Sequence, residues 1–254
     1  MSKSTVAVLA TVALLLTGGL ARAQDSWSTR DEVGFVAARG NSDAETANAK
    51  IEVIREINKW KYTLATSGLY GRSASITSAQ HVDGRFQTDH AFGERSFWFG
   101  AVRYEDDRFS GFDYQSTATT GLGHKFIDTD ATKLAIQIGA GYRALRPELL
   151  VRDPITNEVT ARVLGDRSHD GVANGALTFS HAFNDHTRVL NSLLTEAGQA
   201  NTLTRNDLSL EVKMIKTFAV SIGFSLRHNS EPAGLKSTDT LTTVNLVYVK
   251  NNQP

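Results

Sequence analysis

The strongest constraint in this sequence is a two-residue alternation of apolar and polar side chains that recurs along most of the chain. It is clearest in 218–227, where apolar side chains alternate with small or polar ones, and it recurs in 207–214 and 133–143. Successive side chains of a β-strand point to opposite faces, so this pattern predicts strands with one apolar and one polar face. The three-to-four spacing of an amphipathic helix is nearly absent.

We expect about twelve such strands. Many are longer than the ~5–6 residues usual in globular sheets and match the ~9–11 residues of a tilted membrane-crossing strand. The segment 187–197 has mixed faces and is included mainly to keep the pattern closed. The expected strands cover 31–40, 45–57, 60–72, 81–92, 95–106, 113–126, 132–145, 168–182, 187–197, 203–215, 218–228 and 239–249.

The connections between these strands form two interleaved sets. The short turns are 58–59, 93–94, 127–131, 183–186 and 216–217. The other set is mostly longer and comprises 73–80, 107–112, 146–167, 198–202 and 229–238, with 41–44 as its short member. Short turns at one rim and long loops at the other predict an all-β fold, an antiparallel up-and-down transmembrane β-barrel with periplasmic turns, external loops and both chain ends on the periplasmic side. The 22-residue connection 146–167 is expected to fold into the mouth or to extend outward.

Aromatic side chains form two bands along the predicted strands, as in the girdles of barrels at the two bilayer interfaces. Beside the short turns and the C-terminal end lie Trp60, Tyr62, Phe92, Phe97, Trp98, Phe126, Phe183, Phe218 and Tyr248. Near the opposite strand ends lie Tyr70, Tyr104, Phe109, Phe112, Tyr114 and Tyr142. Aromatic residues of a soluble core would instead be scattered through the strand centres.

If the apolar faces meet lipid, the polar faces line a lumen in which basic groups outnumber acidic ones. A soluble core could not bury so many charges, whereas a watered or salt-bridged lumen could. Twelve strands make a small barrel, so these charges either pair and block the lumen or leave a narrow channel. Glycines at alternate positions of neighbouring strands, Gly121, Gly123, Gly139 and Gly141, indicate a bend or a close approach inside the lumen. The predicted lumen-lining residues are Lys50, Glu52, Arg85, Asp89, Arg95, Arg103, Glu105, Lys125, Lys133, Arg143, Asp207, Glu211, Lys213 and Arg227.

The N-terminal segment 1–23 has the features of a cleaved signal peptide. Lys3 precedes an apolar stretch, and Ala21-Arg22-Ala23 has the small-x-small form of a cleavage site, which predicts export. The rest of the chain, 24–254, is then expected to form a single barrel domain. Beyond it, no apolar run approaches the ~18 residues of a helical span. The formal charge is zero, so nothing indicates a nucleic-acid partner. With no cysteine, disulfides and thiolate metal sites are excluded.

Two groups of residues are candidates for chemistry. The run Glu105-Asp106-Asp107 with Asp113 offers oxygen ligands for Ca²⁺, but its spacing matches no metal loop, and we expect a solvated loop partly paired with Arg108. His169-Asp170 lies near Asn174 and follows Ser168, yet neighbours on a strand point to opposite faces, so a hydrolase site is not expected. The seven histidines show no paired metal spacing. We therefore expect no enzymatic activity, cofactor or metal.

Several segments resemble the domain-of-unknown-function family 481, often labelled a salt-induced outer membrane protein. They are 33–37, 40–42, 104–109, 111–114, 121–123 and 244–248, and the likeness spans about 30–249. The resemblance implies an outer-membrane barrel of Gram-negative bacteria and no established activity. One departure is that six residues follow Tyr248, whereas such barrels commonly end on an aromatic residue that the assembly machinery recognises. The most specific motif comprises Tyr104, Glu105, Asp106, Asp107, Arg108, Phe109, Gly111, Phe112 and Asp113.

Three functional hypotheses follow. The favoured one is a non-enzymatic outer-membrane barrel with a structural or narrow-channel role, linked through the family label to salt or osmotic stress. Its expected partners are outer-membrane lipid and, during biogenesis, the barrel-assembly machinery. The alternatives are a soluble periplasmic β-barrel that holds a lipid or small molecule, which requires apolar side chains inside, and an outer-membrane hydrolase, which requires a reactive serine.

Overall fold

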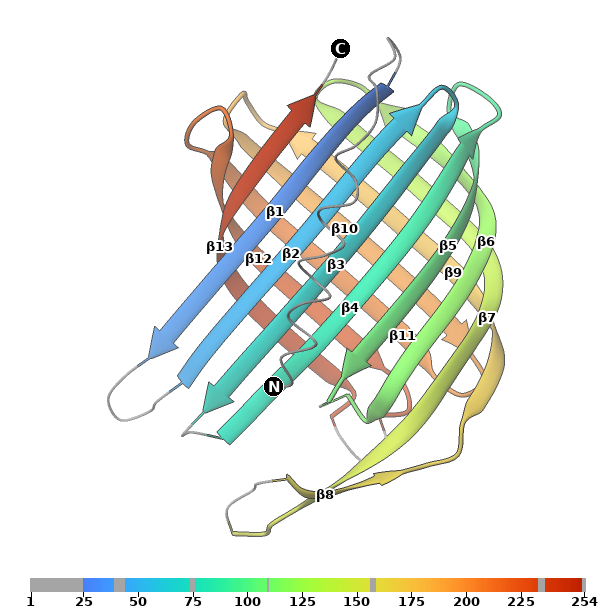
Figure 1. Cartoon of the computed structure of the whole chain (residues 1–254). Helices are drawn as coiled ribbons and strands as arrows, with labels where there is room; N and C mark the ends of the chain where they lie inside the picture. Colours follow the sequence, from blue (N-terminus) through green and yellow to red (C-terminus); the bar gives the residue numbers. More distant parts are fainter. Residues whose placement is uncertain are drawn as a thin grey trace.

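The chain forms a closed antiparallel β-barrel (Figure 1). The computed structural model describes residues 25–38, 44–73, 76–108, 110–155, 159–232 and 236–252. Neighbouring strands in the sequence pair around the ring, which closes where β6 pairs with β7 and β1 pairs with β13. The strands are β1 (Asp25–Ala38), β2 (Ala44–Ile57), β3 (Trp60–Ser73), β4 (Ile76–Ala91), β5 (Ser96–Asp107), β6 (Phe112–Asp128), β7 (Thr132–Arg152), β8 (Val159–Leu164), β9 (Ser168–Ala182), β10 (Thr187–Gly198), β11 (Thr202–Lys213), β12 (Phe218–Asn229) and β13 (Thr238–Asn252).

Twelve of these strands make up the wall, as the alternation predicts, because β7 pairs with β9 and β8 stands outside the ring. Of the two arrangements expected for the connection 146–167, the structure has the outward one (Figure 1), but most of the segment is strand. β7 runs on to Arg152 and pairs with β8 from Glu148↔Leu164 onward, so the two form a hairpin that extends beyond the wall (Figure 1). The strand predicted over 187–197 is present as β10.

Three other predicted boundaries are wrong. β4 begins at Ile76, so most of the predicted loop 73–80 is strand. β1 begins at Asp25 instead of 31, and β13 continues to Asn252, where its last residues pair with the start of β1. In all three places the backbone pairs although the apolar–polar alternation fades, because ladder hydrogen bonds do not depend on side-chain polarity. The predicted signal peptide 1–23 lies outside the described residues.

The two rims of the barrel differ. The short-turn rim carries the turns 58–59, 92–95, 129–131, 183–186 and 214–217 together with both ends of the wall, because Trp27 pairs with Asn252. Asn58 in the first of these turns has a φ of 56°, a left-handed conformation that asparagine tolerates. The opposite hairpin rim carries 108–111, the β7–β8 hairpin and the segments 199–201 and 230–237, of which 233–235 lie outside the described residues.

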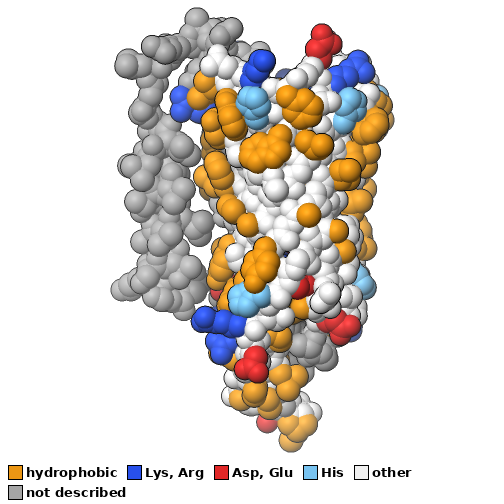
Figure 2. All heavy atoms as spheres, turned by 90° about the vertical axis from the view of Figure 1, so that its right-hand side faces the viewer, with side chains coloured by type: hydrophobic (Ala, Val, Ile, Leu, Met, Phe, Trp, Pro, Cys, Tyr) orange, Lys and Arg blue, Asp and Glu red, His pale blue; other side chains and the backbone are white. Residues whose placement is uncertain are grey.

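Apolar side chains cover the outside of the wall, and charged ones lie inside. Phe35, Ile138 and Phe224 in the strands are 67%, 68% and 43% exposed, whereas Arg103 and Arg143 are 8% and 0% exposed. Figure 2 shows hydrophobic side chains spread over the outer face, with charged side chains gathered at its two ends. This inversion of a soluble protein is the arrangement of a transmembrane barrel. The described residues contain no helix long and apolar enough to cross a membrane.

The aromatic residues mostly lie on the outside near the two rims. Exposed rings at the short-turn rim include Trp60, Trp98 and Phe126, and the hairpin end has Tyr104 and Tyr142. Two residues assigned to these bands from the sequence lie elsewhere: the Phe97 and Phe112 side chains are buried, at 8% and 3% exposure. Phe109 lies outside the described residues.

Candidate functional site: the charged lumen

The predicted lumen-lining residues fall into three groups. Asp89, Arg103, Glu105, Arg143 and Glu211 are buried. Lys50, Glu52, Arg85, Asp207 and Arg227 are half-buried. The prediction fails for four residues that are exposed at the short-turn rim, namely Arg95, Lys125, Lys133 and Lys213. The alternation assigns a side chain to a face, but a residue at the end of a strand reaches solvent beyond the lumen.

A first set of ion pairs joins β5 to β10 through the lumen. The Arg103 guanidinium donates to Glu196 Oε2 at 2.5 Å and to Glu105 Oε2 at 2.7 Å. Thr117 Oγ1 also donates to Glu196, at 3.1 Å. All four side chains are buried, so each charge is compensated by a charged partner inside a water-poor interior.

A second set joins β4 and β5 to β11 and β12. Arg227 binds both Glu105 and Asp107, the latter at 2.6 Å. Arg205 donates to Asp83 at 3.2 Å, and the His81 ring lies 2.8 Å from the same carboxylate. In the ring order β5 lies opposite β12, and β4 lies opposite β11, so these pairs cross the full width of the lumen. We call the whole set the cross-lumen cluster: His81, Asp83, Arg103, Glu105, Asp107, Glu196, Arg205, Asp207 and Arg227.

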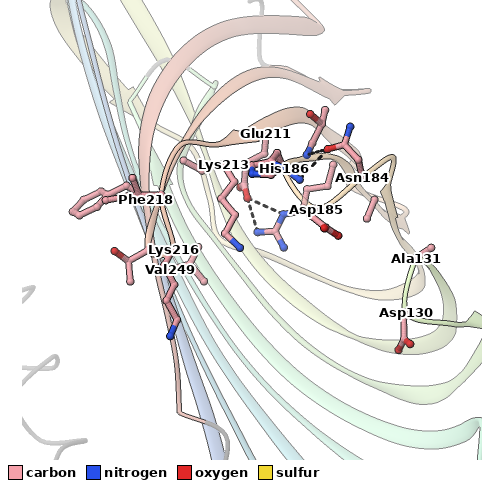
Figure 3. Close-up of a pocket in the computed structure, with 16 residues that line it drawn as sticks. Asp130, Ala131, Asn184, Asp185, His186, Glu211, Lys213, Lys216, Phe218 and Val249 are labelled. Carbon is pink, nitrogen blue, oxygen red and sulfur yellow. Dashed lines mark hydrogen bonds and ion pairs between the residues drawn. The ribbon is translucent and has the colours of Figure 1, made fainter.

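The cross-lumen cluster leaves little open space in the middle of the barrel. Beside Arg103 and Glu196 there is a cavity of only about 10 Å³, about the room for one water molecule. At the short-turn rim, by contrast, a chamber of about 520 Å³ opens between the turns (Figure 3). The lumen is therefore open at the short-turn rim and narrowed in its middle by the cross-lumen cluster, where the Lys50, Arg205 and Asp207 side chains stay 38%, 27% and 25% exposed.

Ion pairs of Glu211 and hydrogen bonds of Asn184 fix two parts of the chamber at the short-turn rim. Glu211 accepts from Arg188 at 2.7 Å (Figure 3) and forms an ion pair with Arg30 at 2.5 Å, so its buried carboxylate lies between two guanidinium groups. Asn184 Oδ1 accepts from the backbone N–H groups of His186 and Thr187 at 2.9 and 2.8 Å, which fixes the turn at the mouth.

A separate group, the wall cluster, lies at the hairpin rim. Arg143 and Asp170 are direct register partners on β7 and β9, and Arg143 Nη2 donates to Asp170 Oδ2 at 2.9 Å. Arg143 also donates to the Asn201 backbone oxygen, and Asp170 accepts from the Ala200 N–H at 3.0 Å. The pair therefore holds the segment 199–201 against the wall instead of crossing the lumen.

Two of the four glycines singled out from the sequence, Gly123 and Gly139, lie under inward-facing rings. A Cβ on Gly123 would lie 2.2 Å from Phe97 Cζ, and one on Gly139 would lie 3.0 Å from Phe99 Cζ. A Cβ on Gly121 would meet the Ile138 backbone oxygen at 2.1 Å. The close approach inside the lumen is thus made by the Phe97 and Phe99 rings, which the absence of side chains on β6 and β7 admits.

The family motif is divided between the two faces of the wall. Glu105 and Asp107 point inward to Arg227, so the expectation of a solvated acidic loop is wrong for these two residues. Tyr104 faces outward and stacks on Tyr114 with centroids 6.4 Å apart, and Asp106 is exposed. The remaining motif residues lie at the rim. The Arg108 backbone carbonyl accepts a hydrogen bond from the Arg162 guanidinium, and the Asp113 carboxylate lies 4.0 Å from the Arg146 guanidinium. Gly111 has a φ of 83°, and the Phe112 side chain is buried.

Two possible chemical sites can be judged from this geometry. His81, Glu105 and Asp107 bring their donor atoms within 4.8 Å of one another, a spacing that suits a metal ion. Arg227 already neutralises both carboxylates, so we assign no metal to them. The His169 ring stacks on Tyr142 on the outer face, whereas Asp170 points inward to Arg143, and no hydrolase triad is assembled there.

A family model described as "Protein of unknown function, DUF481" matches residues 32–249. No curated protein matches the chain. The translocator domain of the autotransporter NalP from Neisseria meningitidis is 11% identical, with a TM-score of 0.49 and coverage of 99% of this chain and 97% of that one. The NanC porin is 13% identical, with a TM-score of 0.44 and coverage of 88% and 97%. The toluene transporter TodX from Pseudomonas putida is 10% identical, with a TM-score of 0.37 and coverage of 92% and 90%.

Proposed function

We propose that this chain, which belongs to the DUF481 family, is a non-enzymatic outer-membrane barrel with a narrow ion pathway that its own side chains hold closed. The observation that carries the proposal is the cross-lumen cluster, in which Arg103 binds Glu196 on the distant strand β10 and Arg227 binds Glu105 on the opposite strand β5. In this placement the short-turn rim faces the periplasm and the hairpin rim faces outward, as in other outer-membrane barrels.

The nature of the barrier favours a closed pathway over a permanent plug. All the members of the cross-lumen cluster are side chains of wall strands, namely β4, β5, β10, β11 and β12. Side chains can exchange partners without unfolding the wall, and charged walls are typical of conducting barrels. The soluble alternative requires an apolar interior, whereas the buried interior here includes Arg103, Glu105 and Arg143.

The test is single-channel conductance of the purified mature protein in planar bilayers under KCl gradients. We expect the wild type to be mostly closed, with small steps of weak cation preference, because the five carboxylates of the cross-lumen cluster outnumber its three guanidinium groups. Arg103→Ala/Arg227→Ala removes both guanidinium groups from the middle of the lumen and should give larger and more frequent steps. Lys125→Ala at the short-turn rim is the matched control and should behave as the wild type does.

A double variant that inserts, shows heat-modifiable mobility and still does not conduct would contradict the pathway and leave a plugged barrel with a structural role. We include the link to salt stress in this proposal. It predicts that open probability rises with KCl concentration, because salt weakens the ion pairs of Arg205 with Asp83 and Asp207, where the Arg205 side chain is 27% exposed. An open probability that does not change with KCl would contradict the link to salt stress and leave the ion pathway standing.

A further inference from the structure

Three histidines on the outer face of the barrel share one local geometry. His124 Nδ1 lies 2.9 Å from Ser96 Oγ, His181 Nδ1 lies 2.8 Å from Thr132 Oγ1, and His228 Nδ1 lies 2.9 Å from Thr238 Oγ1. In each case the hydroxyl residue is the direct register partner of the histidine on the neighbouring strand. Each hydroxyl holds one ring nitrogen, which leaves Nε2 on the opposite edge of the imidazole.

Two of these pairs lie at the same depth, at the short-turn rim. Ser96 is the first residue of β5 and Thr132 is the first residue of β7, so both pairs begin directly after a short turn. The ring of His124 meets Phe126 edge-on at 5.0 Å, and His181 meets Phe183 in the same way at 4.9 Å. Phe126 and Phe183 are 55% and 61% exposed, which places both histidines in an outward aromatic band.

Fixed polar groups in such a band need a polar partner from the membrane. At the bilayer interface the hydrogen-bond acceptors within reach are lipid phosphate and ester oxygens, and aromatic rings mark that depth. When the hydroxyl donates to Nδ1, Nε2 carries the proton and becomes a donor held at a set angle. The exposed Arg95, next to Ser96 in the chain, adds positive charge beside the first pair.

We infer that the Ser96–His124 and Thr132–His181 pairs bind the phosphate of phospholipid headgroups in the leaflet at the short-turn rim. The hydroxyl orients the imidazole, the imidazole donates from Nε2 to a phosphate oxygen, and the phenylalanine packs beside the lipid. The inference rests on the membrane placement in the proposed function but not on the ion pathway, so conductance and lipid contact can fail independently.

The test uses the mature protein, with its histidines isotopically labelled at nitrogen, in liposomes of phosphatidylethanolamine and phosphatidylglycerol. Magnetisation transfer between imidazole N–H groups and lipid phosphorus should give two signals, and His124→Phe/His181→Phe should remove both while keeping ring bulk. Ser96→Ala/Thr132→Val keeps the imidazoles but frees them, and should weaken both signals several-fold. His169→Phe, at the stacked ring on the other end of the barrel, is the control and should leave both signals unchanged.

A second measurement counts the phospholipids that stay bound when the barrel is transferred to detergent, by native mass spectrometry. The double histidine variant should retain fewer than the wild type. The inference is overturned if the folded double variant retains as many phospholipids, if the wild type gives no contact to lipid phosphorus, or if only inorganic phosphate in the buffer gives a signal.

Discussion

Two buried arginines, Arg103 in the cross-lumen cluster and Arg143 in the wall cluster, have opposite structural consequences. Both lie on strands of the same wall, both face inward, and both bind a carboxylate. Arg103 reaches Glu196, which is 93 residues away and on a strand that is not its neighbour. Arg143 binds Asp170, its direct register partner, and the backbone of Asn201.

The difference shows that the position of the partner decides what a buried charge does in a barrel. A partner on the adjacent strand strengthens the wall and fixes a loop without closing the lumen. A partner on a distant strand ties two walls together and occupies the space between them. The wall cluster should therefore control stability, and the cross-lumen cluster should control stability and passage together.

Removing Arg143 should have the largest effect on stability. Arg143→Met leaves Asp170 buried without its cation and frees the Asn201 carbonyl, and breaking a buried pair costs about 3–5 kcal/mol. Urea unfolding in lipid vesicles measures the free energy of unfolding. Because this pair stays on the wall, conductance should remain that of the wild type, and an open pore in Arg143→Met would contradict the comparison.

Removing Arg103 should cost less free energy and change passage. Arg103→Met leaves Glu196 and Glu105 short of a donor, but Thr117 still donates to Glu196 and Arg227 still pairs with Glu105, so we expect a loss of about 2–3 kcal/mol. The pair variant Arg103→Met/Glu196→Leu should recover part of this stability, since no charge at Glu196 is left unpaired. If the double variant loses more free energy of unfolding than the two single variants lose together, the pair does not act as a unit.

Gly123→Ala tests whether the short-turn half of the lumen is held by packing instead of charge. The new methyl group would overlap the Phe97 ring, and overpacking of this kind costs about 1–3 kcal/mol. Phe97→Ala destabilises the chain by itself because it removes a buried ring, but Gly123→Ala should cost much less in that background, which urea unfolding of the two single variants and the double variant can show. An equal loss with and without the ring would mean that the backbone bend at β6, not the ring, requires the glycine.

The smallest effect should come from an exposed pair. Lys125 Nζ lies 3.0 Å from Asp128 Oδ2, and both side chains are more than a third exposed, at 46% and 34%. Such pairs contribute about 0.2–1 kcal/mol, and salt screens them. Lys125→Gln should therefore lower the urea midpoint only slightly, and less at high salt, which gives the baseline against which the two buried clusters are compared.

The sequence predicts the face of a residue much better than its depth. Arg103, Glu105 and Arg143 were assigned to the lumen by alternation and do lie inside. Arg95, Lys125 and Lys133 follow the same alternation but lie at the ends of strands, and the pairing of β6 with β7 shifts between Lys125 and Ile127. A shift of one residue reverses the faces, and alternation alone carries no mark of where the bilayer ends.

The ion-pair partners could not be found from the sequence. Arg227 and Asp107 are 120 residues apart, and Arg205 and Asp83 are 122 apart, so their meeting depends on the ring order and on the stagger between opposite walls. Both quantities are properties of the closed barrel. The β7–β8 hairpin was missed for a different reason, since its pairing lies outside the membrane and needs no two-faced pattern.

The seam between β1 and β13 has a consequence for biogenesis. Trp27 pairs with Asn252 and Gly34 with Asn245, so the ring is sealed by contacts that join nearly the full length of the chain. Contacts of such long sequence separation form late and slowly, and until they form β1 presents an open edge. β13, the last wall strand to be synthesised, thus turns a curled sheet into a barrel. A nascent chain that lacks β13 would hold an unpaired edge ready for a catalyst of insertion or for aggregation.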